Sequence, residues 1–549
     1  MRILQIAHRA LPHEVGGTEA YMAAVGKALT ARGHECLVLA GTDEGAPEPR
    51  LLTNRCDGVW LSRYAGDLSG WHRGHWTRSF DPGAARLFRE FLAFARPDLV
   101  HLHHWMRLTD NLVAVCAGEG IPVVVSIHDL WISCPRGMRF TRDGAFCTEP
   151  SSPAACLNCV ERTPWQDDAE IASAIDIRVR TLARELELAA CLVVPSEAQK
   201  QLLCRTMGAV FDRARVLPHG SLVEWPSPTR DPTAGFPNRP LQIGYWGNLW
   251  PLKGVHLLLE AARRLAEPDR VAIHLYGGDA PPWYLEELQA AATGLQVRFY
   301  GRYVPSDLAG LDLDLAVFPS LAHESFGLVL DEAFRAGLPV IVSDRGALAE
   351  RAGSAGLIFS AGDTAGLAAR IQEILDRPEL LGVMRSAIPV SPSPAMEVHV
   401  EALERLYQEA TMVSRTPGSA ETHAAVDDKR LEQALRGLAV RDAELDRLQE
   451  RVSGAETEAA RLREMLTRAE TETTELREQT ARLRELLTQA ETETVRLRKL
   501  LTQAETEAAR IRQEWATVQQ TRTYRVVAGL RLLLGVFRPV KQPDRGDGG

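Results

Sequence analysis

Short apolar runs alternate with longer amphipathic segments along the first 410 residues. Short apolar runs between turn residues predict buried strands, whereas apolar positions three and four residues apart predict helices. Strands are therefore expected at residues 2–7, 36–40, 98–103, 122–127, 191–195, 241–246, 271–276, 296–300, 314–318 and 339–343. Helices are expected between several of them, for example over residues 19–32, 255–266 and 366–376. Strands and helices in alternation predict an α/β fold built on parallel sheets.

A proline-rich break interrupts this pattern. Five prolines fall within residues 224–240, and proline fits neither a helix interior nor a central strand. We interpret 224–240 as a linker between an N-terminal domain, residues 1–223, and a C-terminal domain, residues 241–390. A second Pro/Ser-rich stretch precedes a helical pattern that occupies the segment 395–412.

The composition changes near residue 413. Residues 413–428 are polar and predict a flexible joint. Positions a and d of the heptads that follow, from Leu431 to Val518, are uncharged except for Arg441, while Glu and Arg fill the flanks. This pattern predicts a coiled coil over residues 429–520 that joins copies of the chain into a homo-oligomer. The alternative is a single solvated helix, because many a and d positions hold the weakly packing residues Ala and Thr.

The C-terminal tail, residues 521–549, combines basic and apolar side chains. It is too short and too charged to span a bilayer, but it could lie at an anionic membrane surface. The alternative is a helix that packs on another part of the protein. The arginines are Arg522, Arg525, Arg531 and Arg538, and the apolar residues include Val526, Leu530, Leu533, Leu534 and Phe537.

Charge and hydropathy exclude several classes of protein. The 549 residues include 63 Lys and Arg against 72 Asp and Glu, a net charge of −9, which argues against broad nucleic-acid binding. We find neither a run of 18 uncharged apolar residues nor the pattern of a signal peptide. The expected location is the cytoplasm, with the tail allowing peripheral attachment to the inner face of the membrane.

Four of the nine cysteines lie close together in an insertion, residues 133–165. Their spacing is C-x12-C-x8-C-x2-C, in which only one pair has the close spacing of a zinc knuckle. Two interpretations stay open: a structural four-thiolate zinc site, or four unliganded thiols in a lid-like loop. The residues are Cys134, Cys147, Cys156 and Cys159.

Glycines and histidines follow several of the predicted strands. Gly16 and Gly17 follow the first strand and open a helix, where backbone N–H groups can approach an anion, although a tight turn is the simpler explanation. Strand-end histidines indicate a polar cleft at the carboxyl edge of the sheet, or else structural residues. They are His101, His103, His104 and His128, the last followed by Asp129.

The C-terminal domain contains the most informative motifs. A glycine-rich turn with Gly247, Asn248 and Lys253 can hold a phosphate through backbone donors and one ammonium group. Further on, Glu324 and Glu332 are separated by seven residues. Carboxylates at a loop and on the following helix can accept hydrogen bonds from sugar and ribose hydroxyls. The alternative is a helix N-terminus with acidic residues near its dipole.

Taken in this order, the motifs resemble the retaining family 4 glycosyltransferases of the GT-B class, over about residues 1–410. The most specific is Glu-x7-Glu followed by Ala-x-x-Ala-Gly-x-Pro-Val. The resemblance implies two Rossmann-like domains facing a cleft, with the segment 395–412 as a helix that returns to the first domain. Its other carriers are Gly-Gly-Thr-Glu at 16–19, Arg-Gly-His-Glu at 32–35, Pro-Asp-Leu-Val-His at 97–101, His-Asp at 128–129, Pro-Ser-Glu at 195–197, Leu-Pro-His-Gly at 217–220 and the turn at 247–254.

The resemblance also implies roles for individual residues. Glu332 would hold the ribose, Glu324 the donor sugar, and Lys253 the departing diphosphate. His128 would lie beside the donor sugar. Further binding residues implied are Gly16, Gly17, Gly247, Asn248, Ser325, Phe326, Gly327 and Leu328.

One departure from the family concerns phosphate binding. Asn248 stands where the family usually has Arg, so a bidentate phosphate partner is lost, and Arg345 is a candidate to replace it. No carboxylate nucleophile stands out, which favours front-face attack assisted by the departing phosphate, as the resemblance implies. No acidic metal motif appears in the sequence, so we expect no catalytic metal.

The sequence therefore predicts a retaining hexosyltransferase. It would use a UDP- or GDP-sugar as donor and a saccharide or lipid-linked acceptor, in bacterial cell-surface polysaccharide synthesis. The alternative is a catalytically weak GT-B scaffold that works through its coiled coil. A more remote interpretation is an epimerase that acts on a nucleotide-sugar, but the context of the Glu-x7-Glu motif argues against it.

Overall fold

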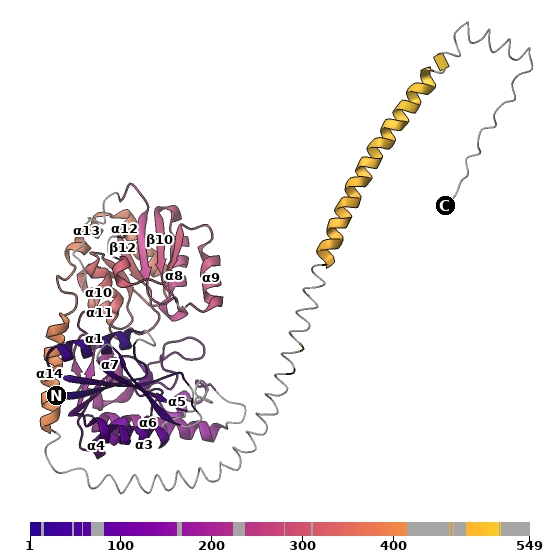
Figure 1. Ribbon diagram of the computed structural model, residues 1–549. Helices are drawn as coiled ribbons and strands as arrows, with labels where there is room; N and C mark the ends of the chain where they lie inside the picture. The colour runs from indigo at the N-terminus through magenta and orange to yellow at the C-terminus, as the bar shows by residue number, and fades with distance from the viewer. Residues whose placement is uncertain are drawn as a thin grey trace, which may run out of the picture. The chain divides into compact units, whose positions relative to one another are not determined.

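The computed structural model describes residues 1–11, 16–44, 46, 49–56, 59–66, 82–161, 167–222, 236–278, 280–308, 311–413, 461, 465, 479–514 and 516–517. These residues belong to two compact units, Met1–Asp427 and Asp428–Gly549. The described residues of the first unit form two sheets with their helices, and those of the second lie mainly in one long helix (Figure 1).

The N-terminal domain is built on an eight-stranded sheet with the order β3-β4-β2-β1-β5-β6-β7-β8. Neighbouring strands are parallel except for β3 and β4. The strands are β1 (Arg2–Ala7), β2 (Glu35–Gly41), β3 (Arg50–Cys56), β4 (Val59–Ala65), β5 (Leu99–Leu102), β6 (Val123–Ser126), β7 (Cys191–Val194) and β8 (Arg215–Val216). The helices are α1 (Gly17–Ala31), α3 (Pro82–Ala95), α4 (Leu112–Gly118), α5 (Pro153–Cys156), α6 (Asp168–Leu188) and α7 (Glu197–Met207).

The C-terminal domain is built on a six-stranded parallel sheet with the order β11-β10-β9-β12-β13-β14. Its strands are β9 (Leu241–Trp246), β10 (Val271–Tyr276), β11 (Val297–Gly301), β12 (Leu315–Phe318), β13 (Val340–Ser343) and β14 (Gly356–Phe359). Its helices are α8 (Val255–Arg263), α9 (Pro282–Ala292), α10 (Leu328–Arg335), α11 (Ala347–Ala352), α12 (Thr364–Asp376) and α13 (Glu379–Ser386). A further helix, α14 (Met396–Val413), follows α13.

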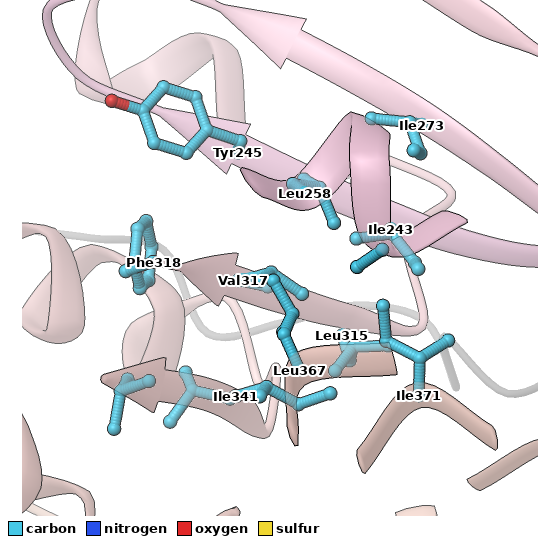
Figure 2. Close-up of a cluster of buried hydrophobic side chains, with 14 of the residues drawn as sticks. Ile243, Tyr245, Leu258, Ile273, Leu315, Val317, Phe318, Ile341, Leu367 and Ile371 are labelled. Atoms are coloured by element: carbon cyan, nitrogen blue, oxygen red, sulfur yellow. The ribbon is translucent and has the colours of Figure 1, made fainter. Parts of the chain in front are cut away.

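Each sheet is covered by apolar helix faces. In the N-terminal domain, α3, α4 and α6 lie on one face of the sheet and α1 and α14 on the other (Figure 1). In the C-terminal domain, Ile243, Val317 and Ile341 of the strands form one core with Leu258 of α8 and Leu367 of α12 (Figure 2). Strands that are buried on both faces have continuous apolar sequences, which explains why they were visible in the pattern.

The α/β fold predicted from the sequence is confirmed. Every strand expected from the apolar runs is present, within one residue at each end. The sequence pattern missed β3, β4, β8 and β14. Of these, β3 lies at the edge of its sheet, pairs antiparallel with β4 and exposes most of its side chains, so it lacks a continuous apolar run.

Helix α14 crosses from the C-terminal domain back to the N-terminal domain. The Tyr407 hydroxyl lies 2.7 Å from His101 Nδ1, and the Tyr21 hydroxyl lies 2.7 Å from His399 Nε2. At the surface, Arg32 forms a 2.8 Å ion pair with Glu404. The chain therefore passes between the two domains twice, once through the segment before β9 and once before α14.

The second unit is described mainly at residues 479–514, which form a helix. Its large apolar side chains are each more than half exposed in the single chain, for example Leu483, Leu487, Leu497 and Leu501. Most of the predicted coiled coil and the whole tail, 521–549, lie outside the described residues, so both stay predictions. Among the helices that are described, none is long and apolar enough to cross a membrane.

Candidate functional site

A cleft of about 370 Å³ lies between the two domains of the first unit. The N-terminal domain contributes residues near the carboxyl ends of β1 and β6, and the C-terminal domain contributes residues after β9 and β12. Loops at the carboxyl ends of parallel strands are the usual place for ligand sites in such sheets. The cleft is lined by Gly17, Thr18, His128, His219, Tyr245, Trp246, Gly247, Asn248, Lys253, Tyr303, Phe318, Ser320, Glu324, Ser325, Phe326, Gly327, Leu328, Val329, Glu332 and Leu348.

An ion pair lies on the C-terminal side of the cleft. Lys253 Nζ donates to Glu324 Oε1 at 2.6 Å, and the Ser320 hydroxyl donates to the same oxygen at 2.8 Å. Burial raises the pKa of Glu324, but Lys253 and the two hydrogen bonds outweigh it, so the net pKa is lowered. Glu324 is therefore a carboxylate at neutral pH.

The turn before α8 places Lys253 at the cleft. Gly254 has φ +71°, and a Cβ there would collide with the carbonyl oxygen of Pro319. Only glycine fits this position without strain, because it tolerates positive φ and has no side chain. The short 3₁₀ turn Pro251–Lys253 therefore packs closely against the end of β12.

The second glutamate of the Glu-x7-Glu motif has a different environment. Glu332 lies on α10, and the Tyr303 hydroxyl donates to its Oε2 at 3.2 Å. Burial raises the pKa of Glu332 to about 7, and the charge of the neighbouring Asp331 acts in the same direction. Glu332 therefore titrates near neutrality, where a bound hydroxyl donor would favour its ionised form.

Arg351, on α11, binds the loop between Glu324 and Glu332. Its guanidinium donates to the carbonyl oxygens of Phe326 and Gly327, at 3.0 Å each, and its Cζ lies 3.7 Å from the centroid of the Phe326 ring. It also pairs with Asp331, which accepts a 2.6 Å hydrogen bond from the Ser393 hydroxyl. Arg351 thus holds the carbonyls of a loop whose residues Ser325–Leu328 line the cleft.

Histidines from several elements converge on the N-terminal side of the cleft. His103 Nδ1 lies 2.9 Å from His128 Nε2, and the His128 and His219 rings stack with centroids 5.2 Å apart. Burial lowers the pKa of His128 to about 4 and that of His103 and His219 well below the usual value. These imidazoles are uncharged at neutral pH.

The contact between His103 and His128 assigns their tautomers. Within the described structure, His103 Nε2 is buried without a hydrogen-bond partner. A buried N–H left unpaired is rarer than an unpaired acceptor, so we assign the proton of His103 to Nδ1, which donates to His128 Nε2. His128 then carries its proton on Nδ1 and offers a neutral N–H donor.

The structure brings most of the site residues predicted from the sequence to one cleft. His128, Lys253, Glu324 and Glu332 line it, together with Gly17, Gly247, Asn248 and the loop Ser325–Leu328. Gly16 does not line the cleft, although it directly precedes α1. Sequence reasoning assigned no site role to Tyr303 or His219, although His219 lies in a quoted family motif.

Among the other candidates from the sequence, the cleft lining does not include His101, His103, His104 or Arg345. His101 is buried between Ser126 and Tyr407, and His104 Nε2 lies 3.3 Å from Asp129 Oδ2. Arg345, the candidate to replace the missing arginine at 248, places its Cζ 4.4 Å from the centroid of the Phe146 ring and does not line the cleft.

The four cysteines of the insertion are all described and all free. Among the described residues, no three His, Cys, Asp or Glu side chains are arranged to hold a metal ion. Cys134, Cys147, Cys156 and Cys159 thus do not assemble as ligands in this structure, and the zinc site stays a prediction without structural support.

Two family models match the chain. Residues 15–221 match the model described as Glycosyltransferase Family 4, and residues 240–377 match the model described as Glycosyl transferases group 1. Glycogen synthase of Mycobacterium tuberculosis is 26% identical over 399 residues, which cover 69% of this chain and 87% of that protein. Phosphatidyl-myo-inositol mannosyltransferase of Mycobacterium leprae is 26% identical over 369 residues, which cover 66% and 84%.

Solved structures show the same two-domain fold. Sucrose-phosphate synthase from Thermosynechococcus elongatus aligns with a TM-score of 0.54 and 20% identity, covering 75% of this chain and all of that one. HepE of Anabaena, solved in complex with UDP, aligns with a TM-score of 0.51 and 19% identity, covering 74% and 100%. At these identities the likeness concerns the fold alone.

The raised pKa of Glu332 predicts a site that costs stability. The native state binds a proton between about pH 4.5 and 7 that the unfolded state releases, so the free energy of unfolding falls as pH rises through this range. Glu332→Gln should therefore raise Tm at pH 8, because it removes a destabilisation of roughly 3 kcal/mol at most in the free energy of unfolding. It should change Tm little at pH 5. Calorimetric melting at both pH values measures this, with the exposed Glu286→Gln as control. A Tm that falls equally at both pH values would contradict the prediction.

Proposed function

This chain belongs to glycosyltransferase family 4, and we propose that it is a retaining, metal-independent hexosyltransferase that uses a nucleotide-sugar donor and a saccharide or lipid-linked acceptor. The observation that carries the proposal is the arrangement of the Lys253–Glu324 pair and Glu332 around the 325–328 loop, in one cleft.

The proposed donor site divides this arrangement into three parts. Glu332, with Tyr303 beside it, receives the ribose hydroxyls. Lys253 and the amides of Ser325–Leu328 receive the diphosphate. Glu324 receives hydroxyls of the sugar, because it is a carboxylate held between Lys253 and Ser320. Gly17 approaches from the opposite domain, where the absence of a side chain leaves room for a ligand.

The proposed chemistry depends on stabilising the leaving group. The bond between the anomeric carbon and the diphosphate oxygen breaks, and an acceptor hydroxyl forms the new glycosidic bond on the same face of the sugar. The hydroxyl proton passes to the departing phosphate oxygen, so no protein base is required. Lys253 and the loop amides stabilise the growing phosphate charge. His128 is neutral and acts through its N–H, as a hydrogen-bond donor to the sugar.

One observation favours a second candidate, a GT-B scaffold with weak activity. Asn248 lines the cleft where the family usually has arginine, and Arg345 binds the Phe146 ring instead of replacing it. The diphosphate site then has Lys253 as its one cationic side chain among the residues that line the described cleft. The intact Lys253–Glu324 pair and Glu332 favour the enzyme.

The C-terminal unit supports a role in assembly. We infer that the heptads join copies of the chain, with the tail at an anionic membrane surface where lipid-linked acceptors are found. This arrangement would suit the synthesis of a bacterial cell-surface polysaccharide. The support is the exposure of Leu483, Leu487, Leu497 and Leu501 on one described helix, at positions a and d of the heptads.

A donor panel tests the proposed activity. The full chain is incubated with UDP-, GDP- and ADP-hexoses, and release of the nucleoside diphosphate is measured with and without chelator. A charge-assisted hydrogen bond contributes about 1.5–3 kcal/mol, so Lys253→Ala should slow release at least about tenfold. The exposed Lys27→Ala is the matched control. Equal rates for wild type and Lys253→Ala, or no release from any donor, would favour the scaffold.

Sedimentation tests the proposed assembly. The full chain should sediment as an oligomer at micromolar concentration, and a chain truncated after residue 413 as a monomer, because the heptad core is the interface. Replacing Leu487, Leu497 and Leu501 by glutamate in the full chain should have the same effect as truncation. If the intact wild type sediments as a monomer, the coiled-coil prediction is wrong.

A further inference from the structure

We propose that Phe146, in the cysteine-containing insertion of the N-terminal domain, is a positioning residue that holds Glu324 of the opposite domain in place. The inference rests on the proposed donor site, because it concerns the sugar-binding end of that site. It gives the insertion a function that does not depend on a metal.

Phe146 is carried by a hairpin, residues 140–146. Phe140 and Phe146 form an antiparallel bridge, and the Thr141 amide donates to the Ala145 carbonyl at 2.9 Å. At the base of the hairpin, Arg136 donates to the Phe140 carbonyl at 2.6 Å. The hairpin is therefore an ordered element.

A buried arginine anchors the base of this hairpin. Arg139 is 1% exposed and donates to the carbonyl oxygens of Ser133, Cys147 and Glu149. Three carbonyls on one guanidinium fix the chain on both sides of the hairpin, because the planar donor groups allow few orientations. Phe146 is thus presented from a rigid support.

The ring of Phe146 contacts two residues of the C-terminal domain. It lies parallel to the His323 ring, with centroids 6.2 Å apart and planes at 14°, and Arg345 Cζ lies 4.4 Å from its centroid. Offset stacking and a cation over the ring face are both favourable geometries. Arg345, the candidate to replace the arginine that is missing at position 248, contacts this ring instead.

Both contacts lie next to Glu324. His323 precedes it in the chain, and Gly346, which follows Arg345, forms a parallel bridge with Glu324. The Ala347 amide donates to the Glu324 carbonyl at 2.8 Å, and a Cβ at Gly346 would collide with the Glu324 backbone. Phe146 therefore touches both segments of the bridge that fixes the Glu324 backbone.

Two other contacts from the N-terminal domain hold the following residues. The Ser196 hydroxyl donates to the Ser325 carbonyl at 2.7 Å, and His219 contacts the Phe326 ring edge-on at 4.8 Å. These contacts act on the part of the loop proposed to bind diphosphate. Phe146 acts on the part proposed to bind sugar, so its loss should be felt there first.

Hydrogen exchange of the ligand-free full chain tests the inference. Phe146→Ala should speed exchange at Ala347, whose amide reports the bridge to Glu324, by roughly fivefold or more, with no change in α12. Phe146→Tyr keeps the ring and should behave as wild type. Arg142→Ala, on the exposed turn of the same hairpin, is the matched control. Unchanged exchange at Ala347 in a folded Phe146→Ala protein would overturn the inference.

Ligand binding gives a second readout, with UDP and UDP-glucose as probes. Phe146→Ala should weaken binding of UDP-glucose roughly tenfold and leave binding of UDP within about twofold, because only the sugar contacts depend on Glu324. An equal loss for both ligands would overturn a role specific to the sugar end. A wild type that binds neither probe nor the other nucleotide-sugars would count against the proposed function, and the exchange data would still decide the role of Phe146.

A second variant covers the case in which Phe146→Ala does not fold. Arg345→Met removes the guanidinium that the C-terminal domain places over the Phe146 ring, and it leaves the sequence of the hairpin unchanged. It should speed exchange at Ala347 in the same way, since the ring then loses one of its two contacts. If Arg345→Met leaves this amide at the wild-type rate, the contact does not hold Glu324 and the inference fails.

Discussion

The ion pair between Lys253 and Glu324 is the interaction on which the geometry of the cleft depends. Glu324 is only 17% exposed, and a carboxylate in that position requires a partner because an unpaired buried charge is costly. The requirement explains the local sequence. Gly254 lets the lysine turn pack against the end of β12, and Ser320 supplies a second donor to the same oxygen. In the proposed reaction, a bound diphosphate would share the lysine that Glu324 holds when the site is empty.

A second constraint is that both domains support the loop between the two glutamates. Arg351 binds its carbonyls from the C-terminal domain, while Ser196 and His219 contact it from the N-terminal domain. Glu350 adds a reciprocal contact, since its carboxylate accepts hydrogen bonds from the Glu197 and Ala198 amides at the start of α7. The shape of the cleft is therefore a property of the domain pair and not of either sheet alone.

Local patterns in the sequence predicted the features that depend on local structure. Continuous apolar runs marked the buried strands, and the spacing of Glu324 and Glu332 marked the loop and helix that carry them. Contacts between distant segments left no such pattern. Tyr303 reaches Glu332, Arg351 reaches the loop from α11, and Phe146 reaches His323 across the domains. The edge strand β3 was missed for a related reason, because a solvated strand needs no apolar run. The same limit applied to Arg345, whose sequence position near the site did not reveal that it binds an aromatic ring.

Calorimetric titration of Glu324→Gln and Glu332→Gln tests the central claim most directly, because it separates the two carboxylates by ligand. Each variant and the wild type are titrated with UDP and with UDP-glucose, or with the nucleotide and donor that the panel selects. The account predicts that Glu332→Gln weakens binding of the free nucleotide, since the ribose contact is common to both ligands. Glu324→Gln should weaken binding of the sugar-bearing donor and leave the nucleotide nearly unaffected. Wild-type affinity for both ligands in both variants would contradict the assignment of this cleft as the donor site.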